Sequence, residues 1–340
     1  MEKILYLAHT EADGTLGKAA LETLGAAVEL AQSDASLTVG LIGEEVQAAA
    51  DVIATCGAEK FLGVAGAEFG ISRYGSDAAA AVALVQSSEA TLVVAPATAR
   101  FCRALPGAAQ RVDGKIDTQV TGIVGEGNDL KVQRWYYRQR MVATLSRTQR
   151  PWFALIASGS FGAWSGTAGS AAVEAIAVEL PEMRTRVVGI EAASTDAQTI
   201  RPEAEMLFVA GAGWTKKQAD GQVHARDAES RILGFLEKAQ ASLGSSKSLV
   251  DQGSEGEEVL SFMSHLNQVG QTGSTPRHPK GLATCCHGEE PHVVGWRFIN
   301  ERRAINLDAG CGWGQGKADV LYVADAFEVM EKVNEMLGES

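Results

Sequence analysis

The sequence predicts an α/β protein with two domains, each built on a mostly parallel β-sheet flanked by helices. Short β-rich runs alternate with alanine-rich helical stretches through the first half, which is typical of a parallel sheet with covering helices. The 340 residues, of which 46% are hydrophobic, exceed what a single core usually holds. A small and polar stretch at residues 192–197 provides a natural boundary between the two domains.

The first elements follow one another in the order expected of strand–helix units. Short apolar runs predict strands at Lys3–His9, Ser36–Ile42, Lys60–Val64 and Thr91–Pro96. Apolar residues that recur at three- and four-residue spacing predict helices at Leu16–Ala31, Glu45–Cys56 and Ser76–Ser88. Because helices separate these strands along the chain, we expect the strands to lie parallel in one sheet.

The pattern changes after Pro96, where several strands follow one another. We predict strands at Gln119–Val124, Leu130–Tyr137, Arg140–Leu145 and Trp152–Ala157. These strands should close the first domain on one side. Val173–Val178 and Arg186–Ile190 continue the β-like character and are expected to be extended as well.

The boundary between the domains is expected at Ala192–Ala197, with Pro202 shortly after it. We therefore divide the chain into an N-terminal domain at 1–194 and a C-terminal domain at 195–340. The second domain opens with an apolar run at Met206–Ala210, which predicts a strand ending in a glycine-containing turn. Amphipathic patterns predict helices at Asp227–Leu243 and Ala326–Leu337.

Composition excludes several classes of function. The chain carries 42 acidic and 30 basic residues, a net charge of −12, so its surface would repel nucleic-acid phosphates. No window approaches about eighteen uninterrupted apolar residues, and the chain opens on a strand rather than a targeting segment. We therefore expect a soluble, cytoplasmic protein that is not an integral membrane protein. Five cysteines are an odd number in a long chain, which favours reduced thiols over a disulfide framework.

Four segments of the second domain each have the character of a strand end or a glycine-opened turn. They are Gln268–Gly273, the pair Gly288 and His292, Ala304–Asp308 and Val323–Phe327. Their order suits a nucleotide threaded across the carboxyl ends of a parallel sheet. Each segment alone could be an ordinary loop, since Gln and Thr are common loop residues. The joint pattern is what indicates a binding site.

This joint pattern resembles the FAD-binding half of the electron transfer flavoprotein α subunit. The Gln-Val-Gly-Gln-Thr-Gly element at 268–273 is nearly identical to that of the family. In the first half, Val94–Thr98, followed by Leu105, Pro106 and Asp113, is similar to the family's Pro-x-Thr loop and the helix and turn after it. The resemblance spans nearly the whole chain. It implies a DHS-like FAD-binding fold for the second domain and contact with a partner subunit for the first.

The resemblance also implies which residues bind the cofactor. The positions that match are Lys247, Val269, Gly270, Gln271, Thr272, His287, Gly288, His292, Asn306 and Asp325. In the family, the loop matching 269–272 lies against the flavin ring and ribityl chain. Gly288 matches a helix start that receives phosphate, and His292 matches a histidine near the pyrimidine carbonyl of the flavin. Asn306 and Asp325 match residues that hold the ribose and adenine end.

Reduced flavin is anionic near N1 and the C2 carbonyl, so a cation there raises the reduction potential. His292 suits this role because imidazole titrates near neutrality. Other positions depart from the family: His287 and Pro291 replace a serine and a glutamine, and Ala212 replaces an arginine of a glycine-rich turn. Lys247 replaces an arginine that could stack on the ring. We therefore expect bound FAD at an altered potential, and a specialised partner.

The resemblance implies an electron carrier rather than a catalyst on an organic substrate. It would be the α subunit of a heterodimeric electron transfer flavoprotein. Its FAD would carry electrons from a dedicated dehydrogenase to a quinone reductase or an iron–sulfur protein. The β subunit would complete the flavin site and hold AMP or a second FAD. The alternatives are a redox-inactive structural or regulatory subunit of a dehydrogenase complex that has kept the fold, and a stand-alone nucleotide-dependent enzyme.

Two other kinds of site receive less support from the sequence. Cys285, Cys286, His287, His292 and Cys311 are metal-ligand types, but vicinal cysteines cannot easily both face one ion and no Cys-x-x-Cys pair exists. We therefore expect no metal. No Gly-x-Ser-x-Gly turn between a strand and a helix supports a serine hydrolase.

Overall fold

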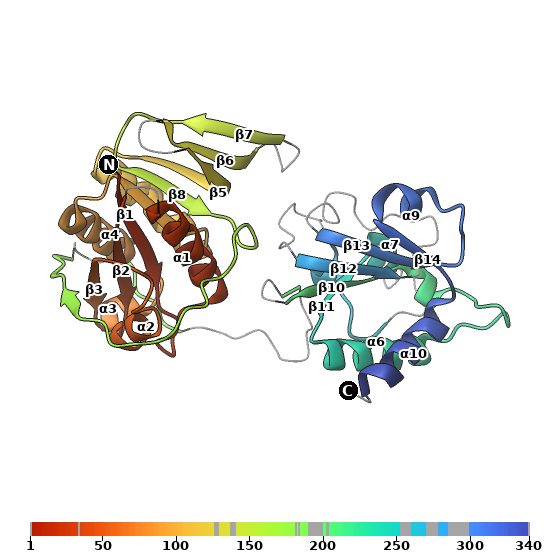
Figure 1. Ribbon diagram of the computed structural model, residues 1–340. Helices are drawn as coiled ribbons and strands as arrows, with labels where there is room; N and C mark the ends of the chain where they lie inside the picture. The colour runs from red at the N-terminus through yellow and green to blue at the C-terminus, as the bar shows by residue number, and fades with distance from the viewer. Residues whose placement is uncertain are drawn as a thin grey trace. The chain divides into compact units, whose positions relative to one another are not determined.

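The computed structural model (Figure 1) describes residues 2–32, 35–125, 129–136, 141–180, 182, 184–189, 200–201, 204–251, 260–269, 278–284 and 299–338. The chain forms two compact units, Met1–Ile190 and Glu191–Ser340. Each unit is a β-sheet flanked by helices, so the expected α/β class is confirmed. The expected boundary between 194 and 195 falls outside the described residues and stays a prediction.

The first unit is built on a nine-stranded sheet with the strand order β7-β6-β5-β8-β4-β1-β2-β3-β9. Its strands are β1 (Lys3–His9), β2 (Ser36–Gly43), β3 (Lys60–Ala65), β4 (Leu92–Pro96), β5 (Lys115–Val124), β6 (Lys131–Tyr136), β7 (Met141–Ser146), β8 (Trp152–Ile156) and β9 (Val173–Ala175). The β5–β6 and β6–β7 pairs are antiparallel, whereas the other pairs are parallel. The first three strands expected after Pro96 therefore form the antiparallel end of a mixed sheet, and the fourth, β8, pairs in parallel with β4 and β5.

Helices cover both faces of this sheet (Figure 1). They are α1 (Lys18–Ala31), α2 (Gln47–Val52), α3 (Ala67–Gly70), α4 (Tyr74–Ser88) and α5 (Ala99–Arg111). Leu24 of α1 packs in the same core as Tyr6 of β1, while Leu84 of α4 packs in the other core with Leu5. Because β1 is buried on both faces, its sequence is a continuous apolar run rather than an alternating one.

The expected extension of the β-like segment beyond β9 is wrong. The strand ends at Ala175. Residues 186–189 of the expected strand Arg186–Ile190 belong to no strand of the sheet, and Ile190 lies outside the described residues. Val188 is 87% exposed, so the apolar pair Val187 and Val188 does not mark a buried strand here. A strand needs a neighbour to bond its backbone, and valine content alone does not supply one.

The second unit is built on a five-stranded sheet that is parallel throughout, with the order β11-β10-β12-β13-β14. Its strands are β10 (Met206–Ala210), β11 (Ser242–Ser245), β12 (His278–Thr284), β13 (Ile299–Asn306) and β14 (Val320–Val323). Its helical elements are α6 (Ala225–Ala239), α7 (Lys247–Asp251), α9 (Gly312–Lys317), α10 (Ala326–Gly338) and the 3₁₀ turns η2 (Ala212–Thr215) and η4 (His265–Asn267). Counted along the chain, the strand order is 2-1-3-4-5, which reverses between β10 and β12.

Two apolar cores lie on the two faces of this sheet. On one face α6 and α10 pack over Phe208 and Leu243, and on the other Val209 packs with Val269 and Cys311. The expected helix Asp227–Leu243 is too long, because α6 ends at Ala239. Gln240 adopts a left-handed conformation with φ of 50° that terminates the helix, and Leu243 belongs to β11. No helix within the described ranges is both long and apolar enough to span a bilayer.

Candidate functional site

The carboxyl ends of the five parallel strands of the second unit lie level along one edge of the sheet. Ala210 of β10 is the register partner of Ser245 in β11 and of Thr284 in β12, and Asn306 of β13 is the partner of Val323 in β14. Four interstrand spacings separate β11 from β14, or about 19 Å. Open α/β sheets bind ligands outside this edge, at the point where the strand order reverses.

Val269 lies against the end of β11. Its N–H donates to the Ser245 carbonyl at 3.0 Å, so the segment at 268–269 continues the sheet beyond β11. The Val269 side chain is fully buried. A Cβ atom added at Gly244 would meet Val269 Cγ2 at 2.5 Å, so this close approach requires glycine.

Lys247 begins α7 directly after β11, but its ammonium already has a partner. Its Nζ forms an ion pair with Asp251 one turn later, and His265 Nε2 lies 2.9 Å from the other Asp251 oxygen. The hydrogen bonds from Lys247 and His265 hold the pKa of the Asp251 carboxyl below its usual range. The Lys247 side chain is 59% exposed, so solvent screens this pair and leaves the ammonium accessible.

Asn306 and Asp325 lie at the other end of this carboxyl edge, where β13 and β14 end. The Asn306 carbonyl accepts a hydrogen bond from the Ala324 N–H at 3.2 Å, which places the ends of β13 and β14 side by side. Asp325 Oδ1 accepts from the Phe327 N–H at 2.7 Å and caps α10. One Asp325 oxygen therefore has a structural role, whatever the other binds.

The structure thus brings four of the ten expected cofactor-binding residues to one edge of the sheet, as two pairs at its two sides. Lys247 and Val269 lie at the β11 side, and Asn306 and Asp325 lie at the β13–β14 side. The other six expected residues lie outside the described residues, so their roles stay predictions: Gly270, Gln271, Thr272, His287, Gly288 and His292.

The expected absence of a metal also remains untested. Within the described part of the chain, no group of three or more His, Cys, Asp or Glu residues could hold a metal ion. However, four of the five candidate ligands lie outside that part: Cys285, Cys286, His287 and His292. The fifth, Cys311, is buried, and its sulfur accepts a hydrogen bond from the Gly314 N–H at 3.4 Å at the start of α9.

The glycine turn after β10 is packed rather than open. The Gly211 N–H donates to the Thr284 carbonyl at 2.8 Å, so this donor is not available to an anion. Trp214 is fully buried against Phe327, with ring centroids 4.6 Å apart, and its Nε1 donates to Thr284 Oγ1. Near this turn, positive charge comes instead from the exposed pair Lys216 and Lys217, which directly follow η2.

Two buried polar side chains at the end of β11 have no hydrogen-bond partner among the described residues. They are the Ser245 hydroxyl and the Gln268 carbonyl oxygen, on residues that are 0% and 5% exposed. Buried polar groups are almost always satisfied in native proteins, so two orphans side by side indicate a missing partner. Gln268 adjoins the predicted loop, whereas Ser245 carries no signal in the sequence.

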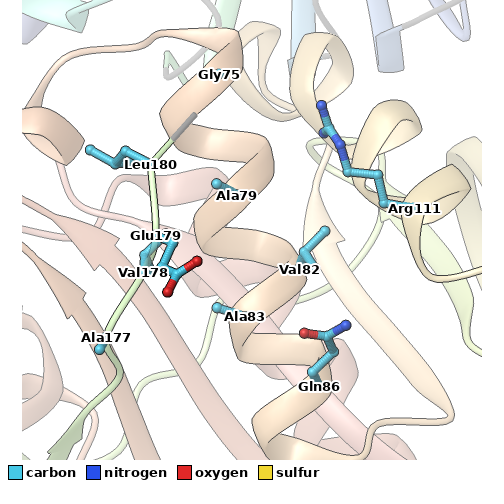
Figure 2. Close-up of a pocket in the computed structure, with 10 residues that line it drawn as sticks. All are labelled: Gly75, Ala79, Val82, Ala83, Gln86, Arg111, Ala177, Val178, Glu179 and Leu180. Atoms are coloured by element: carbon cyan, nitrogen blue, oxygen red, sulfur yellow. The ribbon is translucent and has the colours of Figure 1, made fainter. Parts of the chain in front are cut away.

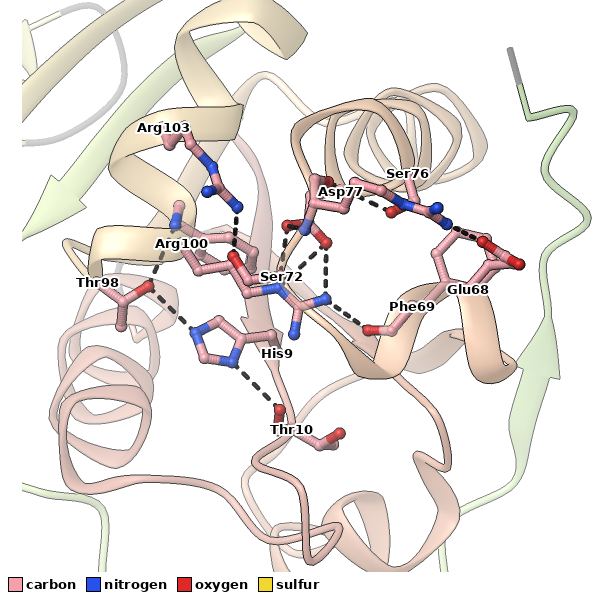
Figure 3. A network of polar contacts seen from close by, with 12 residues as sticks. His9, Thr10, Glu68, Phe69, Ser72, Ser76, Asp77, Thr98, Arg100 and Arg103 are labelled. Atoms are coloured by element: carbon pink, nitrogen blue, oxygen red, sulfur yellow. Dashed lines mark hydrogen bonds and ion pairs between the residues drawn. The ribbon is translucent and has the colours of Figure 1, made fainter. Parts of the chain in front are cut away.

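A second polar cluster lies in the first unit, at the carboxyl ends of β1 and β4 (Figure 3). Thr98 Oγ1 accepts from the Phe101 N–H at 3.2 Å and lies 3.1 Å from His9 Nε2, to which its hydroxyl donates when the ring is neutral and protonated at Nδ1. His9 Nδ1–H then donates to the Thr10 carbonyl at 3.2 Å. Burial, and then the charge of Arg100, lower the pKa of His9, which agrees with this neutral tautomer.

The charged members of this cluster are also satisfied within the protein. Arg100 binds both carboxylate oxygens of the fully buried Asp77 and donates to the Phe69 carbonyl at 2.5 Å. Arg103 donates to Ser72 Oγ at the surface of the same cluster (Figure 3). Because the buried groups are paired, we interpret the cluster as the framework that fixes the Pro-x-Thr loop rather than as a binding site.

A groove of about 510 Å³ lies elsewhere in the first unit, between α4 and residues 177–180 (Figure 2). The wall on α4 consists mostly of glycine, alanine and valine side chains. Gln86, Arg111 and Glu179 are the polar residues of its lining. This combination offers shape but no concentration of chemical groups, so we assign it no function.

Comparison with known proteins identifies the family. The family model for the electron transfer flavoprotein domain matches residues 4–182, slightly more than half of the chain. The chain therefore belongs to the electron transfer flavoprotein family, and the resemblance inferred from the sequence is confirmed. The matched residues lie in the first unit, and the five-stranded sheet lies beyond them.

Individual relatives are distant. The electron transfer flavoprotein subunit alpha of Bradyrhizobium diazoefficiens is 27% identical over 261 residues, which cover 77% of this chain and 76% of the relative. Protein FixB of Clostridium saccharobutylicum is 26% identical over 324 residues, which cover 92% and 88%. A crystal structure of MurG from Acinetobacter baumannii covers 99% of this chain and 91% of that chain at 10% identity, with a TM-score of 0.30. A score this low carries no structural argument.

Proposed function

We propose that this chain is the α subunit of a heterodimeric electron transfer flavoprotein and binds FAD along the carboxyl edge of its five-stranded sheet. The observation that carries the proposal is the placement of Lys247, Val269, Asn306 and Asp325 along that one edge. Its strand order reverses where nucleotides bind in comparable sheets. In this proposal the second unit is the DHS-like FAD-binding domain expected from the sequence.

The residues present fit an extended dinucleotide. The edge spans about 19 Å from β11 to β14, which gives room for a flavin at one side and an adenosine at the other. The unsatisfied Ser245 and Gln268 side chains lie at the β11 side, beside Lys247. Lys216 and Lys217 would supply positive charge for the phosphates between the two ends, in place of the arginine that the family carries in this turn.

When bound, FAD supplies the chemistry of one-electron transfer, and the protein supplies position and charge. Val269 fixes the start of the loop that would lie against the flavin, because its N–H is bonded to β11. Lys247 would offer a cation to the flavin ring, weakened by its pairing with Asp251. His292 is proposed to favour the reduced flavin in the same way, and Asn306 and Asp325 to hold the adenosine end.

The β subunit would complete this site and hold AMP or a second FAD. We propose that it contacts the first unit on the antiparallel strands β5–β7. Apolar side chains are exposed there, with Tyr136 at 55%, Met141 at 58% and Val142 at 51%. Tyr136 ends β6 and the other two begin the edge strand β7, and exposed apolar side chains gathered at a sheet edge are typical of a protein interface. A dedicated dehydrogenase would donate electrons, and a quinone reductase or iron–sulfur protein would accept them.

A redox-inactive subunit of a dehydrogenase complex is the second candidate function. The Lys247–Asp251 pair favours it, because a lysine that is paired with a carboxylate stabilises reduced flavin less than the arginine of the family would. The visible spectrum of the co-expressed α and β subunits separates the two candidates. Flavin bands that bleach on reduction support the electron carrier, whereas a colourless pair that takes up no added FAD supports the structural subunit.

A further inference from the structure

Ser245 and Gln268 project from adjacent backbones to the same face of the sheet. They are partners in a parallel bridge, and such partners point to one side. Leu243, two residues before Ser245, packs in the core under α6 and α10, so Ser245 points to that face. Val269 packs in the opposite core, so its neighbour Gln268 points to the α6–α10 face as well. The two orphan oxygens therefore belong to one small polar site.

The chemistry of the two groups restricts what can satisfy both. The Gln268 carbonyl oxygen only accepts, so its partner must carry a proton, and a phosphate or carboxylate oxygen does not. The Ser245 hydroxyl can donate as well as accept, so a partner that uses its proton must have a lone pair, which a ring N–H lacks. A single hydroxyl group accepts from Ser245 and donates to Gln268 at once.

From this geometry we propose that Ser245 and Gln268 together bind one hydroxyl of the ribityl chain of FAD. The proposal rests on the proposed function and adds two binding residues that the resemblance does not implicate. Along the chain, the two residues adjoin Lys247 and Val269, which are proposed to lie at the flavin end of the cofactor. The hydroxylated chain next to the flavin ring is the part of FAD that supplies such a group.

The proposal predicts opposite effects on stability and on binding. In the ligand-free protein the two orphan groups are unfavourable, since each is buried and has no partner among the residues that the structure describes. Removing them should leave folding unharmed or improve it, while binding loses a hydrogen bond. Removing a hydroxyl that has only a structural role should instead lower stability and leave FAD binding unchanged. Ser242, in the same strand and also fully buried, is a matched control because its Oγ accepts from the Arg201 N–H at 2.7 Å.

The test compares Ser245→Ala, Gln268→Met and the control Ser242→Ala in the α/β assembly after FAD has been removed. FAD dissociation constants are measured by fluorescence titration, and melting temperatures are measured without ligand. We expect each of the first two variants to bind FAD about three- to tenfold more weakly. Their melting temperatures should be unchanged or about 2 °C higher. Ser242→Ala should melt lower and bind FAD like the wild type.

Lumiflavin identifies the group that is bound, because it has the same ring without the hydroxylated chain. The Ser245→Ala and Gln268→Met variants should bind lumiflavin with the same affinity as the wild type. An equal penalty with lumiflavin would overturn the assignment to a hydroxyl. Variants that bind FAD like the wild type would show that internal water or protein groups satisfy the two oxygens, and would overturn the inference alone. A wild-type assembly that binds no FAD would overturn the proposed function and this inference together.

Discussion

Replacing Gly244 by alanine tests how closely Val269 must approach β11. The new Cβ would lie 2.5 Å from Val269 Cγ2 and 3.2 Å from Leu207 Cδ1. Carbon atoms pack at about 3.5–4.0 Å, so Val269 must move by about 1 Å or the strand must shift. Overpacking of this kind costs about 1–3 kcal/mol. The strain falls on the hydrogen bond between the Val269 N–H and the Ser245 carbonyl.

Amide hydrogen exchange at Val269, measured by NMR on the full chain, reports the opening of this bond. A loss of about 1–3 kcal/mol corresponds to exchange about five- to 150-fold faster. Gly316→Ala in α9 is the control, since a Cβ there meets nothing within 4 Å and alanine favours a helix. FAD affinity should fall in the Gly244 variant only. If exchange at Val269 is unchanged in Gly244→Ala, or is equally faster in Gly316→Ala, then the close approach of Val269 to Gly244 does not stabilise this hydrogen bond.

Three further predictions concern charge and the partner surface. Burial alone would raise the pKa of Asp117, but hydrogen bonds from Arg147 and Trp152 outweigh it and hold the pKa below its ordinary value. Asp117→Asn should therefore lower the free energy of unfolding by about 2 kcal/mol above pH 5. The denaturation curves of the variant and the wild type should converge as the pH falls through the folded pKa of Asp117. A difference in stability that does not change with pH would contradict this prediction. Lys247→Gln should lower the flavin potential by about 10–40 mV in a redox titration, and an unchanged potential would remove Lys247 from its role. Met141→Glu should weaken co-purification with the β subunit without changing the melting temperature of this chain, and an intact complex would place the interface elsewhere.

The sequence predicts the buried parallel strands well because they leave a strong signal. Lys3–His9 and Met206–Ala210 are bounded in the structure as expected, since strands buried on both faces are continuous apolar runs. The sequence does not predict the short strand β11, because its residues, Ser-Leu-Gly-Ser, are mostly small and polar. Its one large apolar residue, Leu243, falls at helical spacing after α6. Only the left-handed Gln240 shows that the helix has already ended, and glutamine gives no sequence signal for this conformation.

The candidate site was predictable where a residue follows a strand. Asn306 and Asp325 end or follow strands, so their common edge could be inferred from strand order alone. The pairing of Lys247 with Asp251 at four-residue spacing was also readable in principle, but only with α7 known to be a helix. The sequence could not predict that the Ser245 hydroxyl and the Gln268 carbonyl oxygen have no hydrogen-bond partner among the described residues. Whether a buried polar group finds a partner depends on tertiary contacts rather than on residue type.

The central claim is that the flavin lies along the carboxyl edge of the five-stranded sheet. Hydrogen–deuterium exchange of the α/β assembly, compared with and without FAD, tests it most directly. The account predicts slower exchange in peptides that contain the ends of β11 and β13, Val269 and the start of α10, with peptides of the nine-stranded sheet unchanged. Protection confined to residues 4–182, or no protection at a saturating FAD concentration, would contradict it.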